Sequence, residues 1–173
     1  MKYYLDDKVF KTKTDFQNFL QFTIEKYNKE NKKSPKTKLF DKEIKHIKNK
    51  IPLTEQTPWG GVSLKKVDVT KDFIQKLLVV QKYGILGFEI HKKKLEKLII
   101  LEGSCLILYS NHKSKNWKIG KISTKMASVG DQFEFQPYDE HGIIAFSNCV
   151  IEETSTNHLD DLTYIFKADQ VSS

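Results

Sequence analysis

Residues 89–96 read Glu-Ile-His-Lys-Lys-Lys-Leu-Glu, and this stretch brings three candidate metal ligands into one short segment. Residues two apart in a strand point to the same face, so Glu89 and His91 are aimed together if the segment is extended. Four residues separate His91 from Glu96, which is enough for a hairpin turn that returns Glu96 opposite His91 on the neighbouring strand. This local motif therefore predicts three ligands of a metal site.

A fourth candidate ligand, His141, lies far along the chain, directly after Pro137-Tyr138-Asp139-Glu140. If the chain closes into a barrel, His141 can supply the last ligand. Two histidines and two carboxylates suit Zn, Mn, Fe or Ni, and spacing does not choose among these divalent metals. Glu89 is either a ligand or the acceptor of an imidazole N–H. The other histidines lack partners at ligand spacing and are expected on the surface; they are His46, His112 and His158.

The chain from residue 58 to residue 173 consists of short apolar runs separated by turn residues. Strands at a spacing of roughly ten residues are typical of a sandwich or barrel. We therefore expect a mainly β domain over residues 58–173. The expected strands are Gly61–Val69, Phe73–Gln81, Ile85–His91, Lys97–Glu102, Ser104–Ser110, Trp117–Ser123, Gln132–Phe135, Gly142–Ser147, Cys149–Thr154 and Leu162–Phe166.

Residues 1–57 have a different, helical pattern. Thr14 and Gln17 have the spacing of a capping box, and apolar residues then recur at helical intervals. These signals predict a helix over 15–29, followed by a polar loop over 31–36 and a shorter helix that Asp41 caps. Pro52 and Pro58 end helix formation. We expect this segment to pack on the barrel, or on a second copy of the chain.

Composition narrows the classes of partner. The 173 residues are 39% hydrophobic and carry a net charge of +7, and all 29 basic residues are lysines. Nucleic-acid recognition would favour arginine forks among aromatic residues, so we expect no nucleic-acid partner. No apolar run approaches the roughly 18 residues of a membrane span, and the N-terminus lacks a secretory signal, so we expect a cytoplasmic protein without a membrane partner. Cys105 and Cys149 lie in apolar runs and are expected to be buried thiols.

The spacing of the candidate ligands resembles the cupin family. Its first motif ends in a pair of ligands two residues apart, then a Glu, then a Gly seven residues beyond that Glu. Its second motif opens with Gly and reaches a His eleven residues later. The matching residues are Glu89, His91, Glu96, Gly103, Gly130 and His141. The resemblance covers about residues 58–166 and implies a cupin barrel, which is a double-stranded β-helix or jelly roll, around one divalent metal.

Within the cupins, the chain looks most like the type II phosphomannose isomerase domain, which also occurs fused to mannose-1-phosphate guanylyltransferases. Pro58-Trp59-Gly60 looks like the opening of that domain, and Lys94 occupies its basic position between His91 and Glu96. The resemblance implies aldose–ketose isomerisation of a sugar or sugar phosphate such as mannose 6-phosphate. Lys94 and Glu152 are then the candidate catalytic residues at the cavity wall. Many cupins dimerise, so the resemblance also implies a homodimer.

Departures from that pattern keep other readings open. This chain has Glu89 where the phosphomannose isomerase domain has Gln, and Tyr164 where it has Arg. Lysine lacks the bidentate fork of arginine, so Lys94 would bind a phosphate only as a point charge. Residues 92–94 are alternatively a solvated turn, and Glu152 is alternatively an exposed cap. Two alternative functions therefore stay open. The lost arginines and the altered first ligand favour a non-enzymatic binding module, and an Fe(II)-dependent dioxygenase would use the same ligand set.

Overall fold

The computed structural model describes residues 18, 50–82, 84–110 and 123–166. The helices expected over 15–29 and after Asp41 fall almost entirely outside this part of the chain, as does most of the strand expected at Trp117–Ser123. The strands are β1 Glu55–Thr57, β2 Gly60–Asp68, β3 Phe73–Val80, β4 Ile85–Ile90, β5 Glu96–Glu102, β6 Ser104–Ser110, β7 Ser123–Ser128, β8 Gln132–Phe135, β9 Glu140–Ala145, β10 Cys149–Ser155 and β11 Thr163–Phe166. A short 3₁₀ helix, Val69–Lys71, joins β2 to β3.

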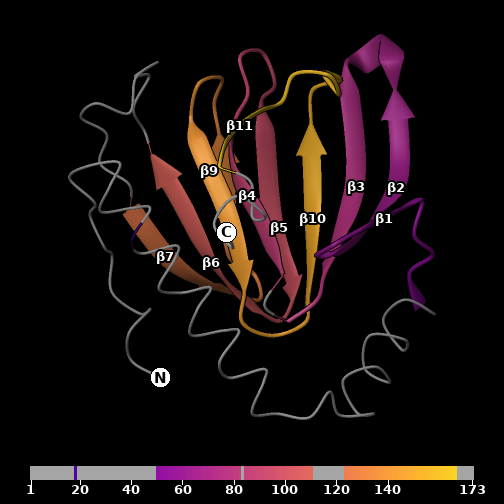
Figure 1. Ribbon diagram of the computed structural model, residues 1–173. Helices are drawn as coiled ribbons and strands as arrows, with labels where there is room; N and C mark the ends of the chain where they lie inside the picture. Colours follow the sequence, from indigo (N-terminus) through magenta and orange to yellow (C-terminus); the bar gives the residue numbers. More distant parts are fainter. Residues whose placement is uncertain (1–17, 19–49, 83, 111–122, 167–173) are drawn as a thin grey trace.

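The strands form two antiparallel sheets that face each other (Figure 1). One sheet has the order β1-β2-β3-β10-β5-β8, and the other has the order β11-β4-β9-β6-β7. In Figure 1 the strands converge toward the bottom of the view and spread apart toward the top. The mainly β barrel expected from the sequence is confirmed. The first sheet already includes Glu55–Thr57, which pair with β2 and which the sequence pattern had placed in the segment before the barrel.

The core lies between the two sheets and follows the two-residue period of a strand. In β5, Glu96, Leu98 and Ile100 are buried on one face, whereas Lys97 and Ile99 are only partly buried. Each fully buried aliphatic side chain contributes about 1.5–3 kcal/mol to folding. Cys105 and Cys149 are buried free thiols, as expected. Within the described residues, no helix is long and apolar enough to cross a membrane.

Candidate metal centre

Four side chains from both sheets meet inside the barrel. Glu89 on β4 lies directly opposite His141 on β9, because these two residues are partners in the register of the strands. Glu96 is the first residue of β5 in the facing sheet, and His91 follows the last residue of β4. One ligand atom from each of these side chains lies within 4.8 Å of all the others. The structure therefore brings together all four candidate ligands that the sequence spacing predicts.

The route of the chain between His91 and Glu96 differs from the expected hairpin. β4 pairs with β9 and β11, whereas β5 pairs with β10 and β8, so the loop crosses from one sheet to the other. Glu96 thus faces His91 across the barrel and is not its neighbour in a ladder. The backbone N–H groups of a loop that crosses between sheets cannot pair with a neighbouring strand, so they need another hydrogen-bond acceptor. The carboxylate of Asp161 is that acceptor.

Asp161 fixes this loop with its side chain. Its carboxylate accepts hydrogen bonds from the backbone N–H groups of Lys92, Lys93 and Lys94, at 3.0, 2.5 and 2.9 Å. Burial works against the charge of this carboxylate, but the three N–H groups together hold the pKa of Asp161 below its usual value. The side chains of the three lysines differ in exposure: Lys92 and Lys93 are exposed, whereas Lys94 is buried.

The main chain of Asp161 also sets the orientation of His91. Its carbonyl oxygen pairs with Nδ1 of His91, so Nδ1 carries the proton and Nε2 is left as an acceptor. That Nε2 lies 3.4 Å from Oε1 of Glu89 and 3.7 Å from Oε2 of Glu96. A histidine whose far nitrogen is tied to a carbonyl is the usual arrangement of a metal ligand, because it fixes both tautomer and ring orientation.

His141 completes the cluster from the opposite strand. Its Nε2 lies 3.5 Å from Oε1 of Glu89 and 3.3 Å from Oε1 of Glu96. The ring of Phe135 stacks on the imidazole with centroids 4.2 Å apart and an interplanar angle of 7°. Phe135 therefore holds the ring in place by packing.

The residues of the cluster fit a divalent metal ion. Among the buried polar atoms of the described residues, Nε2 of His91 and both ring nitrogens of His141 lack a hydrogen-bond partner. Buried nitrogens without partners are costly unless another group satisfies them. A cation held by the two Nε2 atoms and the two carboxylates would give both Nε2 atoms a partner and would also neutralise both negative charges.

The charges of the metal-free cluster depend strongly on one another. Burial opposes ionisation of Glu89, but the nearby imidazole rings of His141 and His91 outweigh it and lower the pKa of Glu89 to about 2. Burial likewise opposes protonation of His141, but Glu96 and Glu89 outweigh it and raise the pKa of His141 to about 10. A proton on His141 thus supplies part of the positive charge that a metal ion would bring.

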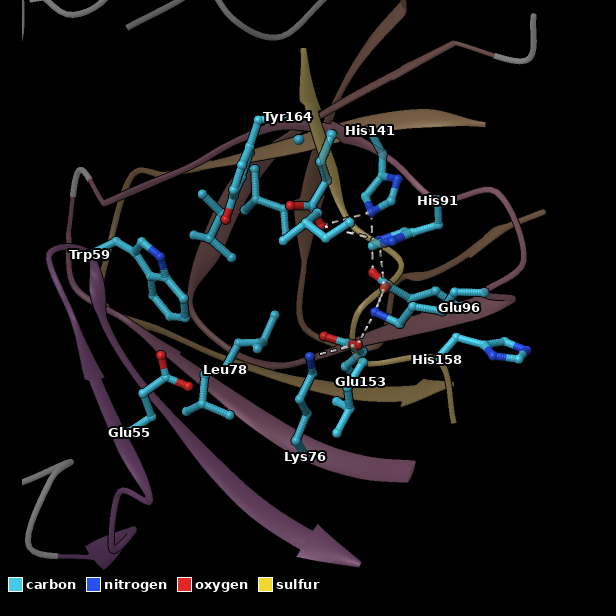
Figure 2. A pocket seen from close by; sticks show the side chains of 18 residues that line it. Glu55, Trp59, Lys76, Leu78, His91, Glu96, His141, Glu153, His158 and Tyr164 are labelled. Atoms are coloured by element: carbon cyan, nitrogen blue, oxygen red, sulfur yellow. Dashed lines mark hydrogen bonds and ion pairs between the residues drawn. The ribbon is translucent and has the colours of Figure 1, made fainter. Parts of the chain in front are cut away.

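The cluster lines one side of a cavity of about 280 Å³ that opens beyond the metal ligands. Figure 2 shows Lys76 and Glu153 on the wall below His91 and His141, with Trp59 and Leu78 on another side. Oε1 of Glu153 lies 2.7 Å from Nζ of Lys94 and 3.0 Å from Nζ of Lys76. Lys94 also forms an ion pair with Oε2 of Glu96. A continuous series of ion pairs therefore runs from Glu96 in the candidate metal cluster to Lys76, on what we call the far wall of the cavity.

Comparison with known proteins identifies the fold. No family model matches the sequence, and no curated protein matches it. Among solved structures, KdgF from Halomonas sp. has a TM-score of 0.50 and 14% identity over 65% of this chain and 94% of that one. Peruvianin-I, a cysteine peptidase from Thevetia peruviana latex, has a TM-score of 0.52 and 17% identity over 68% of this chain and 74% of that one. A recombinant oxalate oxidase in complex with glycolate has a TM-score of 0.50 and 16% identity over 65% of this chain and 61% of that one.

The fold is that of the cupins. At 14–17% identity the likeness shows the fold alone, and it does not extend to the phosphomannose isomerase group that the sequence resembles. The four clustered side chains give this cupin barrel a site that can hold a metal ion. The identity of the metal does not follow from the geometry, because the same ligand set suits several divalent ions.

The two candidate catalytic residues lie in different places in the cupin barrel. Lys94 lines the cavity, but its ammonium group is held between Glu96 and Glu153. Glu152 does not line the cavity, and its Oε2 accepts a hydrogen bond of 2.8 Å from Nε2 of Gln75. The next residue, Glu153, lines the cavity instead.

Sequence reasoning missed Glu153, which lies on the buried face of β10. Residues two apart in β10 share a face, and Cys149, Ile151, Glu153 and Ser155 are all buried. Burial raises the pKa of Glu153, and the nearby Glu96 adds to this effect, while the ammonium groups of Lys94 and Lys76 partly offset it. His158, expected on the surface, also lines the cavity.

Proposed function

We propose that this chain is a metal-dependent enzyme that interconverts an aldose and a ketose, acting on a sugar or sugar phosphate. The observation that supports this proposal most directly is that the four metal ligands share a cavity with Glu153, an ionisable group that is not a ligand. Aldose–ketose isomerisation needs polarised substrate oxygens and a group that moves a proton between adjacent carbons. Both requirements are represented by side chains that line this cavity.

In this proposal each wall residue has a distinct role. A bound metal ion, held by Glu89, His91, Glu96 and His141, supplies Lewis acidity toward the carbonyl and hydroxyl oxygens of the substrate. Glu153 takes the proton from one carbon and returns it to the next. Its Oε1 is anchored by two ammonium groups, which fixes the position of the carboxylate and leaves Oε2 outside these two ion pairs. This role replaces the one that the sequence pattern assigned to Glu152.

A second candidate function is a binding module without catalysis. Lys94 and Glu153 already form an ion pair at 2.7 Å, and Lys94 is also paired with Glu96. Side chains that neutralise one another in this way form a rigid wall, and a rigid polar wall is suited to recognition of a ligand. In this reading the metal ion and the wall bind a sugar that leaves the cavity unchanged.

The first experiment establishes the metal. The metal content of the purified chain is measured by elemental analysis, beside His91→Ala and His141→Ala variants whose fold is checked by circular dichroism. We expect about one metal ion per parent chain and loss of that ion in both folded variants. A parent that holds no metal after incubation with Zn, Mn, Fe and Ni salts would remove the basis of the catalytic proposal.

The second experiment separates the two candidate functions. The metal-loaded chain is incubated with aldoses and aldose phosphates in D₂O, and NMR follows both ketose formation and deuterium uptake at the carbon next to the carbonyl. We expect turnover in the parent, a loss of 10²–10⁴-fold in Glu153→Gln, and near-parent turnover in the matched control Glu152→Gln. Tight binding of a sugar without turnover or deuterium uptake would favour the binding module.

A further inference from the structure

Two ammonium groups line the cavity, and they differ in how far they are already engaged. The side chain of Lys94 is 7% exposed and lies between two carboxylates. The side chain of Lys76 is 19% exposed, and Glu153 is its only carboxylate partner among the described residues. An ammonium group has three N–H donors, so Lys76 retains donors that a ligand in the cavity can use.

The ammonium group of Lys76 lies no farther from Glu96 than a small substrate can span. Three consecutive ion pairs join it to Glu96, by way of Glu153 and Lys94. Three hydrogen-bond lengths amount to roughly 9 Å at most. A chain of five or six carbon atoms, with bonds of about 1.5 Å, covers such a span.

The charges along the cavity favour an anion at its far wall. Glu89 and Glu96 together neutralise a divalent ion. Beyond them, the two ammonium groups of Lys76 and Lys94 face the single carboxylate of Glu153, which leaves one positive charge in excess. The other acidic residue that lines the cavity, Glu55, is exposed, so water screens its charge. An unbalanced charge inside a partly enclosed cavity attracts a ligand of opposite sign more strongly than it would at the surface.

We propose that Lys76 binds the anionic end group, a carboxylate or a phosphate, of a short polyhydroxylated substrate whose other end lies at the metal site. This inference rests on the proposed function, because it requires the metal site to hold the carbonyl end of the substrate. Lys76 is then the residue that selects an acidic or phosphorylated sugar over a neutral one. Glu153 remains paired with Lys94 when the substrate anion shares the ammonium group of Lys76.

Three sugars that differ only at carbon 6 test this inference: glucose, glucuronate and glucose 6-phosphate. Isothermal titration calorimetry of the metal-loaded full chain gives the dissociation constant of each. We expect at least one of the two anionic sugars to bind ten or more times tighter than glucose, and the stronger of them identifies the end group as carboxylate or phosphate.

Variants at Lys76 then locate the preference. Lys76→Met should abolish it, and Lys76→Arg should retain it because the charge is kept. The matched control is Lys65→Met, which removes an exposed lysine of β2 outside the cavity and should leave the preference unchanged.

The outcomes separate this inference from the proposed function. Equal binding of all three sugars, no binding of any of them, or an unchanged preference in Lys76→Met would overturn the role of Lys76. If the anionic sugar binds through Lys76 but no isomerisation follows, the inference on the anion holds and the isomerase proposal fails. If isomerisation occurs with equal efficiency on glucose and on its anionic counterparts, the reverse is true.

Discussion

Replacing Lys94 with methionine removes the ammonium group that lies between two buried carboxylates. Nζ of Lys94 pairs with Glu96 on the metal side and with Oε1 of Glu153, at 2.7 Å, on the wall side. Burial by itself would lower the pKa of Lys94, but the two carboxylates raise it above its usual value. The ammonium group is therefore fully charged at neutral pH, and it balances the negative charges of both buried carboxylates.

The expected loss of stability follows from the burial of this series of ion pairs. Removing one partner of a buried ion pair costs about 3–5 kcal/mol, because the other partner is left charged in a poor solvent for charge. For a domain of this size each kcal/mol shifts the melting temperature by about 2–4 °C, so we expect a decrease of roughly 6–20 °C in Lys94→Met. The matched control is Lys93→Met, which removes an exposed charge in the same loop and should change stability by less than about 0.5 kcal/mol.

The assays are thermal and chemical denaturation of the chelator-treated protein, since a bound metal ion would add its own stabilisation by mass action. A double variant, Lys94→Met with Glu153→Leu, removes one carboxylate along with the ammonium group and should recover part of the loss. If Lys94→Met and Lys93→Met are equally stable, the series of ion pairs does not contribute as described, and the argument that Lys94 orients Glu96 and Glu153 is wrong.

Four further predictions concern the candidate ligands and the residues around them. Because the pKa of His141 is raised to about 10 in the metal-free site, metal binding displaces a proton, so the apparent affinity for Zn²⁺ should rise about tenfold per pH unit between pH 7 and 9 in a competition assay with a chelator. Because folding raises the pKa of His141, protonated His141 stabilises the metal-free chain fully at pH values below the pKa of the unfolded chain, and this stabilisation is lost as pH rises toward 10. Denaturation midpoints that do not change from pH 7 to 10 would contradict this prediction. Asp161→Ala should weaken metal binding by about 10–100-fold through loss of the three N–H contacts, whereas Asp160→Ala should have no such effect in the same assay. Gly142→Ala should destabilise the barrel by about 1–3 kcal/mol, since its new Cβ would lie 2.3 Å from the carbonyl oxygen of Gly87 on the strand that carries Glu89, and a melting temperature equal to that of the parent would refute this close approach.

The clustering of Glu89, His91 and Glu96 could be predicted from the sequence because their spacing is a local property, whereas His141 joins them only through the closure of the barrel. Glu89 and His91 share a face in any extended strand. The loop from His91 to Glu96 is short, so Glu96 stays close to them whether the next strand lies in the same sheet or in the facing one. The hairpin expected between them was wrong, because the pattern of apolar residues shows where a strand lies but not which strand it pairs with. Pairing depends on contacts far apart in the chain, such as those of β5 with β10.

The phase of β10 shows the same limit on a smaller scale. Glu152 and Glu153 are adjacent in the sequence, so their side chains point to opposite faces of β10. A shift of one residue in the register of this strand would turn Glu152 toward the cavity in place of Glu153. Val150, Ile151 and Cys149 are all apolar, so hydrophobicity did not distinguish the two faces. A register shift between Val150 and Ile151 in the pairing with β5 further obscures the alternation. The strand Ser123–Ser128 was missed because its polar residues give no apolar run.

Asp161 holds the site with both its carbonyl oxygen and its carboxylate, and this has a consequence for the order of events during synthesis and folding. Its carbonyl oxygen orients His91 and its carboxylate holds the loop after that histidine, across separations of 67 to 70 residues. During synthesis, Glu89, His91, Glu96 and His141 all leave the ribosome before this residue does. The chain therefore emerges with its candidate ligands present but not yet oriented, and tight binding of an ion by these residues would have to wait until the segment around residue 161 has docked.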